Sequence, residues 1–371
     1  MQKIPAFPIS KRLAASAAAI ALMAGALAGC GTSSSEGTEK IRFGLPTIMG
    51  ANNSPLAVAE HLGYFKEEGL EVEIINTSDS ASIIQGVSSG SLEIGSTPPE
   101  PLMQAKTKGG PAGDVVLMYN YIRKQTGSIA VLDESDKKSL GDFKGAVIGQ
   151  ANLGISNLLL SNGILNSAGL KPDADFKNLA VGTGAAALQA LKSGNVDALS
   201  LWDTEYAAFE ANGNKLRYFT IPDVETLFST TFFSTPGFVK DHEKAAAGFG
   251  RAMAKATLFT STNPEAALRI LYKAYPQTVT AGKSVDDQLK SDLVSVERRV
   301  KLLTADDPSA QKSWGKYEPA AVAAWTDFAL SADIISAPLD PSDLYTNALV
   351  EKYNDFDSEK VVADANNWKG E

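Results

Sequence analysis

Cysteine and histidine are scarce in this chain of 371 residues, which has one Cys and two His. A single Cys cannot form an internal disulfide, and so few thiol and imidazole groups cannot build a Cys/His zinc cluster. Basic side chains are also outnumbered, because 34 of them face 43 acidic ones and leave a formal net charge of −9. Nucleic-acid binding depends on basic groups that neutralise phosphates, so no nucleic-acid partner is expected. What remains is an ordinary globular composition with a length that suits about two domains.

The N-terminal segment has the composition of an export signal. Three basic residues occur before residue 13, no acidic residue occurs before Glu36, and residues 13–27 form an apolar run of 15 residues. This run is shorter than the ~20 residues that a membrane-spanning helix needs. It ends in Leu27-Ala28-Gly29-Cys30, a bacterial lipobox that contains the only Cys of the chain. We expect residues 1–29 to be a lipoprotein signal peptide, Cys30 to carry lipid and residues 30–39 to be a flexible tether. The protein would then be exported and lipid-anchored to the bacterial cell envelope.

Beyond residue 40, short apolar runs alternate with helical patterns, which indicates βαβ units and mainly parallel sheets. We expect residues 40–121 to form the first part of one lobe, residues 122–232 a second lobe with two hinge segments, and residues 233–371 the completion of the first lobe with C-terminal helices. The pattern predicts strands at residues 41–45, 70–75, 92–95, 115–119, 128–132, 146–150, 178–181, 196–202 and 216–221, a further extended run at 228–234, and helices at 54–69, 79–90, 98–108, 155–168, 185–193 and 204–211.

Small polar residues are concentrated in the loops that follow the predicted strands. Ligands of open parallel sheets bind beyond the carboxyl ends of the strands, and several of these loops open helices whose free N–H groups suit an anion. Each loop alone is also explained by ordinary helix capping. The candidate ligand-binding residues are Asn52, Asn53, Ser96, Thr97, Asn152, Ser156, Asn157, Thr183, Trp202 and Asp203.

Several of these side chains have two possible roles. Trp202 either forms a wall against the ligand or fills core, and Asp203 either accepts hydrogen bonds from a ligand or complements a helix start. For Glu205 we favour the helix start. Arg123, in an inter-lobe segment, is either a counter-charge for an acidic ligand or a solvated cation. Motifs for phosphate-binding loops, nucleophile elbows and metalloproteases are absent from the sequence, so no cofactor, metal or catalytic residue is expected.

Four segments resemble one known family. They are NSPLAVAEHLGYFKEEGLEV at residues 53–72, IQGVSSGSLEIG at 84–95, SLGDFKGAVIG at 139–149, and LQALKSGNVDA at 188–198 followed by Leu201-Trp202-Asp203. They are similar to the substrate-binding proteins of ABC importers for aliphatic sulfonates, taurine, nitrate and thiamine-pyrimidine precursors. A C-terminal segment at 341–347 extends the likeness. The family usually has Pro-Tyr soon after the acid at 203, and this chain departs from that pattern, which leaves the equivalence of Tyr206 open.

The resemblance implies an α/β fold with two lobes, the type II periplasmic-binding-protein fold, which closes on a small solute by hinge motion. It implies a lipoprotein that acts as a monomer and delivers its ligand to an ABC permease with a separate ATPase. Because the loops carry helix-start amides and hydroxyls, a sulfonate-, taurine- or nitrate-like anion is the favoured ligand. A pyrimidine or another aromatic or nitrogenous nutrient is the alternative.

Two other functions stay open. The same family fold is found in enzymes, a sulfinate desulfinase that relies on a catalytic Cys and a pyrimidine-phosphate synthase that relies on a Cys-rich segment, His residues and a Lys-bound cofactor. The sole Cys of this chain lies in the lipobox, so we expect the protein not to be an enzyme. A sensory lipoprotein that binds a ligand and feeds a signalling partner is the third possibility.

Overall fold

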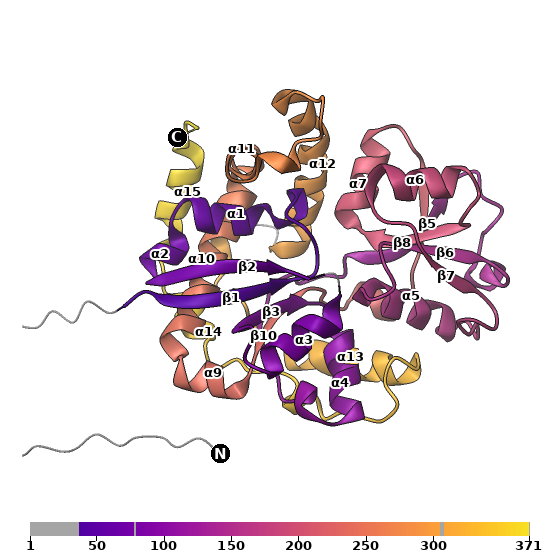
Figure 1. Ribbon diagram of the computed structural model, residues 1–371, viewed down its shortest axis with the longest axis horizontal. Helices are drawn as coiled ribbons and strands as arrows, with labels where there is room; N and C mark the ends of the chain where they lie inside the picture. The colour runs from indigo at the N-terminus through magenta and orange to yellow at the C-terminus, as the bar shows by residue number, and fades with distance from the viewer. Residues whose placement is uncertain (1–36, 78, 305–307, 371) are drawn as a thin grey trace, which may run out of the picture. The chain divides into compact units, whose positions relative to one another are not determined.

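The computed structural model describes residues 37–77, 79–304 and 308–370, and it places them around two β-sheets (Figure 1). The expected signal peptide and the lipid-bearing Cys30 fall in residues 1–36, outside the described residues. Of the expected tether, the last residue, Glu39, already belongs to the first strand.

The first sheet has five strands in the order β2-β1-β3-β10-β4. Both neighbours of β10 run antiparallel to it, whereas β1 pairs in parallel with β2 and β3. Four strands therefore run in one direction, and β10, the last of the five in the sequence, runs in the opposite direction. The bounds are β1 (Glu39–Leu45), β2 (Leu70–Asn76), β3 (Ile94–Thr97), β4 (Val116–Asn120) and β10 (Thr231–Ser234).

The second sheet repeats this plan in the order β7-β6-β8-β5-β9. Here β5 is the antiparallel strand, because it pairs against both β8 and β9 while β6 runs parallel with β7 and β8. The expected α/β fold with two sheets is confirmed, and each sheet is mixed because one strand enters it directly from the other lobe. The bounds are β5 (Gly127–Leu132), β6 (Val147–Gln150), β7 (Lys177–Ala180), β8 (Ala198–Trp202) and β9 (Leu216–Phe219).

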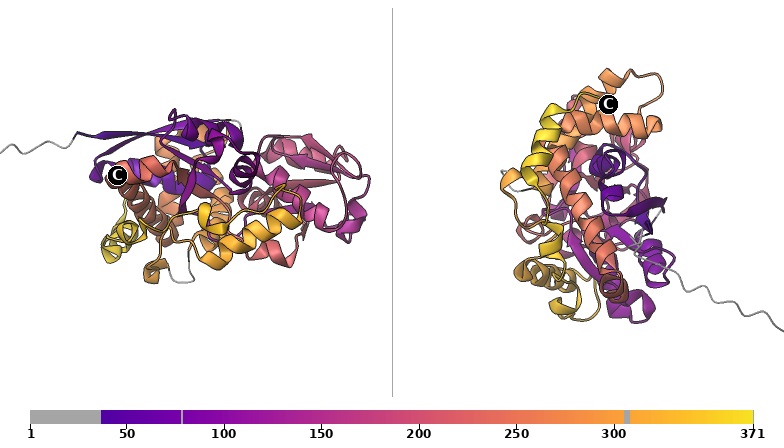
Figure 2. Two further views of the ribbon diagram at one scale, coloured as in Figure 1. Left: turned by 90° about the horizontal axis from the view of Figure 1, so that it is seen from below. Right: turned by 90° about the vertical axis from the view of Figure 1, so that its left-hand side faces the viewer.

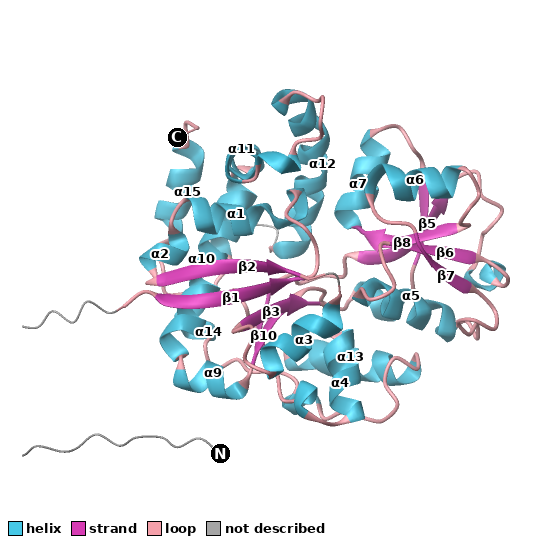
Figure 3. Ribbon diagram, viewed as in Figure 1, coloured by secondary structure: helices cyan, strands magenta, loops and turns pink. Residues whose placement is uncertain are grey.

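Helices cover the sheets on both faces (Figure 3). The first sheet is flanked by α1 (Ser54–His61), α2 (Tyr64–Glu67), α3 (Ser80–Ser88), α4 (Glu100–Lys108), α9 (Pro236–Asp241), α10 (Glu243–Thr262), α11 (Pro264–Ala274), α12 (Val285–Leu303), α13 (Pro319–Ser331), α14 (Val350–Tyr353) and α15 (Ser358–Asn367). The second is flanked by α5 (Ser156–Ser167), α6 (Gly184–Lys192) and α7 (Asp203–Ala211), and α8 (Pro222–Glu225) lies on the return path.

The helix expected over residues 54–69 is two helices. The chain bends at Gly63, whose φ of 78° lies in the left-handed region, so α1 ends at His61 and α2 begins at Tyr64. Only glycine adopts this conformation at low cost. The sequence predicted that the helix would end at Gly69, but the left-handed Gly63 already ends it six residues earlier.

Two segments connect the lobes and lie side by side. The first joins β4 to β5, and the second follows α8 and leads into β10. The Ile122 N–H donates to the carbonyl of Thr230 at 2.9 Å, and the Ser229 N–H donates to the carbonyl of Ile122 at 2.8 Å. The expected division between residues 232 and 233 falls inside β10, which belongs wholly to the first sheet. These paired segments lie where the sequence predicted the two crossings between the lobes, and we call them the hinge segments; their action as a hinge stays a prediction.

One C-terminal segment packs against both lobes. The Gln104 amide of α4 donates to the carbonyl of Ile334, and the Asn166 amide of α5 donates to the carbonyl of Ala332. The Trp325 indole of α13 donates to Phe228, beside the hinge. Figure 2 (left) shows this golden segment alongside both lobes. Part of the sequence assigned to the first lobe therefore also supports the second.

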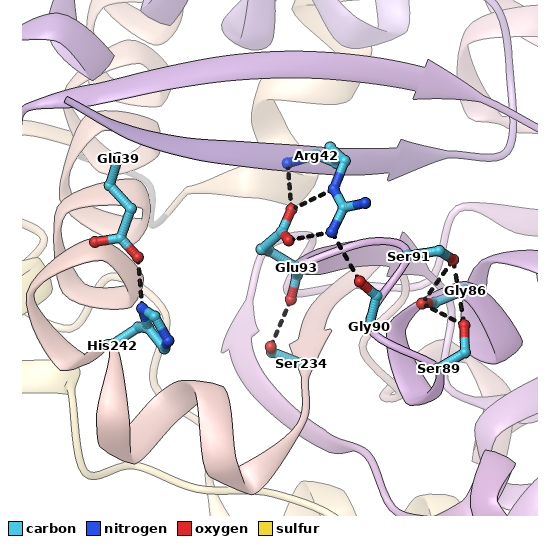
Figure 4. A network of polar contacts seen from close by, with 9 residues as sticks. All are labelled: Glu39, Arg42, Gly86, Ser89, Gly90, Ser91, Glu93, Ser234 and His242. Carbon is cyan, nitrogen blue, oxygen red and sulfur yellow. Dashed lines mark hydrogen bonds and ion pairs between the residues drawn. The ribbon is translucent and has the colours of Figure 1, made fainter. Parts of the chain in front are cut away.

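A polar network fixes β1 to its neighbours in the first sheet (Figure 4). The Arg42 guanidinium meets the Glu93 carboxylate through Nε–Oε2 at 3.0 Å and Nη2–Oε1 at 2.5 Å, and the Arg42 N–H adds a bond of 2.7 Å. Arg42 also reaches the carbonyl of Gly90, and the Ser234 hydroxyl donates to the carbonyl of Glu93. The network ties β1, the turn before β3, and β10 together.

Candidate functional site

A cavity of about 690 Å³, which includes space open to solvent, lies where the two lobes meet the hinge. We call it the first cavity. Its described lining comes from the loops after β1 and β3, the hinge segments, the start of α5 and the end of β8, together with α10 and α12. These are the carboxyl ends of parallel strands in both sheets, where the strand pattern predicted a ligand site.

Aromatic rings form one wall of this cavity. Phe43, Tyr121 and Phe232 line it, and their rings pack together with centroids 5.5 Å apart for Phe43–Phe232 and 4.7 Å apart for Tyr121–Phe232. Burial raises the pKa of Tyr121, so its phenol stays neutral at physiological pH. Trp202 contributes a further ring from the second lobe. A flat ligand between these surfaces would meet rings on both sides.

The polar groups of the first cavity are amides and hydroxyls. Asn53 donates to the Thr47 hydroxyl at 3.2 Å, and Asn157 donates to the carbonyl of Leu201 at 2.9 Å. Their amide nitrogens are thus held by the protein, and their carbonyl oxygens remain available as acceptors. Within the described residues, no hydrogen bond is made by the side chains of Ser96 and Ser156. This set offers both donors and acceptors to a ligand.

The first turn of α5 adds backbone donors. The helix starts at Ser156 after Ile155, a residue without a hydrogen-bonding side chain, so no side-chain cap satisfies its first N–H groups. Both residues line the cavity. Unpaired donors at a helix start favour an acceptor atom of a ligand, charged or neutral.

Arg299 is the one charged side chain among the described residues that line the first cavity. Its guanidinium holds the Asp203 carboxylate through Nε–Oδ2 at 2.9 Å and Nη2–Oδ1 at 2.5 Å, and both side chains are about 6% exposed. Burial alone would lower the pKa of Arg299, but the Asp203 carboxylate outweighs it and holds that pKa above its usual value. The cavity therefore contains a cation whose charge is already balanced.

A second cavity of about 1030 Å³, also including space open to solvent, shares five lining residues with the first: Pro46, Thr47, Asn52, Ile155 and Trp202. Two carboxyl groups line it, from Glu205 on α7 and Asp292 on α12. Burial raises the pKa of both. Glu205 accepts the N–H of Gly184 at 2.6 Å, so it serves the start of α6, whereas a role at the start of its own helix was expected.

Most of the sequence-predicted residues lie in these cavities. Asn53, Ser96, Ser156 and Asn157 line the first, Asn152 and Thr183 line the second, and Asn52 and Trp202 line both. Trp202 also packs against the core cluster of the second lobe, so its core role is confirmed, and its place in both linings leaves the role of a ligand wall as a prediction. Whether these residues contact a ligand stays a prediction.

Three predicted residues lie outside both described linings, each for a visible reason. Thr97 is buried in β3, and its hydroxyl donates to the carbonyl of Pro98 at 3.1 Å. Asp203 is taken up by Arg299. Arg123 points to Ser313, with its Nη1 at 3.3 Å from both the carbonyl and the hydroxyl oxygen. An inter-lobe cation can thus serve the first lobe without facing the ligand site.

Arg299 was missed because the C-terminal part of the sequence was taken only as helical. A signal was present: Leu289, Val296 and Leu303 repeat every seven residues on the buried face of α12, and Arg299 falls on that face. A charged residue at a core-facing helical position needs a buried partner, which is the role of Asp203. The sequence does not indicate which carboxylate supplies it.

The described residues contain neither a cluster suited to a metal ion nor a helix suited to a bilayer. Across residues 37–77, 79–304 and 308–370, no group of three or more His, Cys, Asp or Glu is placed to hold a metal ion. In the same part of the chain, no helix has the length and hydropathy needed to cross a membrane.

Comparison with protein families gives a match over residues 51–267 to the family described as NMT1/THI5 like. This span begins after residues 46–50 of the loop that follows β1, includes the loop after β3, the hinge segments and the whole second lobe, and ends before α12. The segment that supplies Arg299 is therefore outside the matched region.

Sequence relatives and solved structures are both similar to this chain over more than half of its length. The formylaminopyrimidine-binding protein of Halalkalibacterium halodurans is 26% identical over 255 residues, which cover 66% of this chain and 74% of that protein. The 4-amino-5-hydroxymethyl-2-methylpyrimidine phosphate synthase of Legionella pneumophila is 23% identical, over 62% of this chain and 71% of that protein. The alkanesulfonate-binding protein SsuA of Xanthomonas axonopodis superposes with a TM-score of 0.60 at 16% identity, covering 82% of this chain and 98% of that protein. The chain has the fold of the periplasmic binding proteins.

Proposed function

This chain belongs to the NMT1/THI5-like family, and we propose that it is the solute receptor of an ABC-type importer whose ligand is a small uncharged nitrogen heterocycle of the aminopyrimidine type. The receptor would be exported, held at the cell envelope by lipid on Cys30, and would act as a monomer that hands its ligand to a permease. The ligand is the alternative that the sequence left open beside a sulfonate-like anion.

The first cavity carries this proposal. Rings from the first lobe and Trp202 from the second face a common space, which suits a flat aromatic solute better than a tetrahedral one. Amide and hydroxyl groups around it match the donors and acceptors on the edge of an aminopyrimidine. The relative named as a formylaminopyrimidine-binding protein supports the same class of ligand.

The charge of the cavity argues against a sulfonate. A sulfonate keeps its negative charge at all physiological pH values, and in a buried site it needs an unpaired cation or several aligned donors. Arg299 is already paired with Asp203, which leaves the start of α5 as the anion-stabilising feature. A neutral ring needs no counter-charge and can use the same α5 donors through a ring nitrogen.

Binding without turnover is the simpler function for this site. Among the described residues lining the first cavity there is no Cys, His, Lys or carboxylate, so the Ser96 and Ser156 hydroxyls have no such group in the lining to activate them as nucleophiles. Relatives named as synthases keep an enzymatic function in view, so the test must detect turnover as well as binding.

Calorimetry and thermal melting of the purified protein test the proposal. The panel contains 4-amino-5-hydroxymethyl-2-methylpyrimidine, a formylaminopyrimidine, taurine, an alkanesulfonate and nitrate. We expect the pyrimidines to raise the melting temperature by several degrees at 100 times Kd, which corresponds to about 2.7 kcal/mol, and to be recovered unchanged. Stabilisation by the sulfonates alone would show that the ligand is an anion and not a pyrimidine. Chemical conversion of a bound pyrimidine would show that the protein is an enzyme and not a receptor.

A further inference from the structure

We infer that Asp203 sets the charge selectivity of the ligand site by acting through Arg299, so that the closed lobes accept neutral ligands and reject anionic ones. The inference rests on the proposed function in taking the first cavity as the ligand site. It concerns a pair of residues that face each other from different lobes, one of them on a helix beyond the family match.

The pair is an inter-lobe contact. Asp203 is the first residue of α7, which follows β8 of the second sheet. Arg299 lies on α12, a helix anchored in the core of the first lobe through Leu289, Val296 and Leu303. A rotation that parts α7 from α12 would separate the carboxylate from the guanidinium, so we expect this pair to belong to the closed form.

The geometry leaves no spare charge inside the closed cavity. Two of the three guanidinium nitrogens of Arg299 donate to Asp203, and the third, Nη1, is 3.5 Å from the carbonyl oxygen of Asn52. Both partners are almost fully buried. A bidentate pair of this kind keeps its strength because water is excluded from it.

An anion in the first cavity must compete with Asp203 for Arg299. If the anion takes the guanidinium, the Asp203 carboxylate is left buried without a counter-charge, which is strongly unfavourable. If Asp203 keeps it, the anion itself lacks a counter-charge. A neutral ligand faces neither cost, because the pair forms on closure whether or not the ligand is present.

A matched pair of probes tests this selectivity: 4-amino-2-methylpyrimidine-5-carboxamide and the corresponding 5-carboxylate, which share ring and size and differ in charge. We expect the protein to bind the carboxamide at least thirtyfold more tightly. In Asp203→Asn, Arg299 becomes an unpaired cation in the cavity wall, and the preference for the carboxamide should fall at least tenfold. In the double variant Asp203→Asn with Arg299→Gln, the preference should return.

Glu210→Gln is the matched control. It removes the other ion pair between α7 and α12, formed with Arg298, but neither residue lines the first cavity. We expect its preference to stay within threefold of the unsubstituted protein. If the α7–α12 contact had only a structural role, all the variants would change the affinity for both probes by a similar factor, and none would gain affinity for the carboxylate. A preference in Asp203→Asn within threefold of the unsubstituted protein overturns the inference.

A distance measurement separates this inference from the proposed function. Spin labels on Glu71→Cys and Lys192→Cys, both exposed and in different lobes, report closure in a Cys30→Ser background. Without ligand, Asp203→Asn should populate longer distances than the protein with Asp203. If neither pyrimidine probe binds, the proposed ligand class is wrong. The distance measurement then tests the inference by itself, and a distance distribution in Asp203→Asn that equals that of the unsubstituted protein overturns it. If Asp203→Asn does not fold, the distances in the unsubstituted protein test the inference. If the 5-carboxylate closes the lobes as completely as the 5-carboxamide does, the inference is wrong.

Discussion

The carbonyl oxygen of Gly154 accepts a hydrogen bond from the Ser80 N–H at 3.2 Å, which joins the loop after β6 to the first turn of α3. Gly154 belongs to the second lobe and Ser80 to the first, so this is an inter-lobe contact separate from the one between α7 and α12. A Cβ atom on Gly154 would lie 2.6 Å from the Cβ atom of Asp79, closer than side chains tolerate. The lobes approach this closely here because residue 154 has no side chain.

Gly154→Ala is expected to hinder closure. The backbone of Gly154 is not in the left-handed region, so alanine is tolerated in the open form and meets Asp79 only when the lobes close. We expect the Kd for 4-amino-5-hydroxymethyl-2-methylpyrimidine to rise roughly tenfold, a loss of about 1.4 kcal/mol, while the ligand-free melting temperature changes little. Gly141→Ala, where the nearest atom is 3.8 Å away, is the control for calorimetry. Equal affinity in both variants would contradict the prediction.

Trp202→Ala is expected to weaken the same ligand roughly ten- to a hundredfold, or about 1.4–2.7 kcal/mol. The substitution removes the ring that the second lobe brings to the first cavity. Trp202→Phe keeps an aromatic surface and should recover most of the affinity. Titration calorimetry measures both, and an alanine variant that binds as tightly as the phenylalanine variant would exclude stacking on this ring.

Glu100 makes stability fall as the pH rises. It is 1% exposed, its Oε2 has no hydrogen-bond partner within the described residues, and burial raises its pKa to about 8. Between its ordinary pKa of about 4.5 and 8, the folded protein holds a proton that the unfolded chain has released, so rising pH favours unfolding. We expect the stability advantage of Glu100→Gln to grow by on the order of 3 kcal/mol from pH 4.5 to pH 7.

Denaturant titrations at both pH values measure this difference. Glu134→Gln, at an exposed position, is the control and should show no such trend. A Glu100→Gln advantage that is the same at pH 4.5 and pH 7 would mean that the Glu100 carboxyl is already ionised in the folded protein.

Glu93 has the opposite dependence. Its partial burial opposes ionisation, but the bonds from the guanidinium and N–H of Arg42 outweigh this and hold its pKa below the ordinary value. The unfolded state therefore binds the proton more readily than the folded state does. The contribution of ionised Glu93 to the free energy of unfolding is complete above the ordinary pKa and is lost as the pH falls through the pKa of the folded protein. We expect Glu93→Gln to lower the melting temperature by about 3 °C at pH 7 and by less at pH 3. A loss that is as large at pH 3 would assign the effect to packing.

Local patterns predicted the elements well because each element of the two α/β lobes is determined by nearby residues. Asp79 caps α3 as expected, with its carboxylate accepting the N–H of Ser82, and β5 and β7 begin one residue before the predicted ranges. The break at Gly63 was missed because a helical pattern of apolar residues runs through it on both sides. A glycine within such a pattern is tolerated or ends the helix, and the spacing does not decide between the two.

The sequence predicted the part of the site that is formed by the loops at the carboxyl ends of the strands. Asn53, Ser96, Ser156 and Asn157 lie in one cavity because the carboxyl ends of parallel strands share an edge in each sheet. The sequence could not show that Asp203 meets Arg299, 96 residues later, because that contact depends on how the lobes close. It also gave no sign that Arg123 turns to Ser313. Long-range pairing, which decides the charge of the cavity, is not a property of any one segment.

The position of β10 between β3 and β4 of the first sheet determines the order in which the lobes can be completed as the chain becomes available. All five strands of the second sheet lie between residues 127 and 219, so that lobe can fold as soon as this stretch is available. The first sheet lacks the strand between β3 and β4 until residue 234 has been made, and until then two strand edges stay unpaired. The earlier half of the first lobe must therefore wait, with open edges, for a later part of the chain. Unpaired strand edges can pair with other chains, so we expect this half of the first lobe to be the more prone to aggregation while it waits.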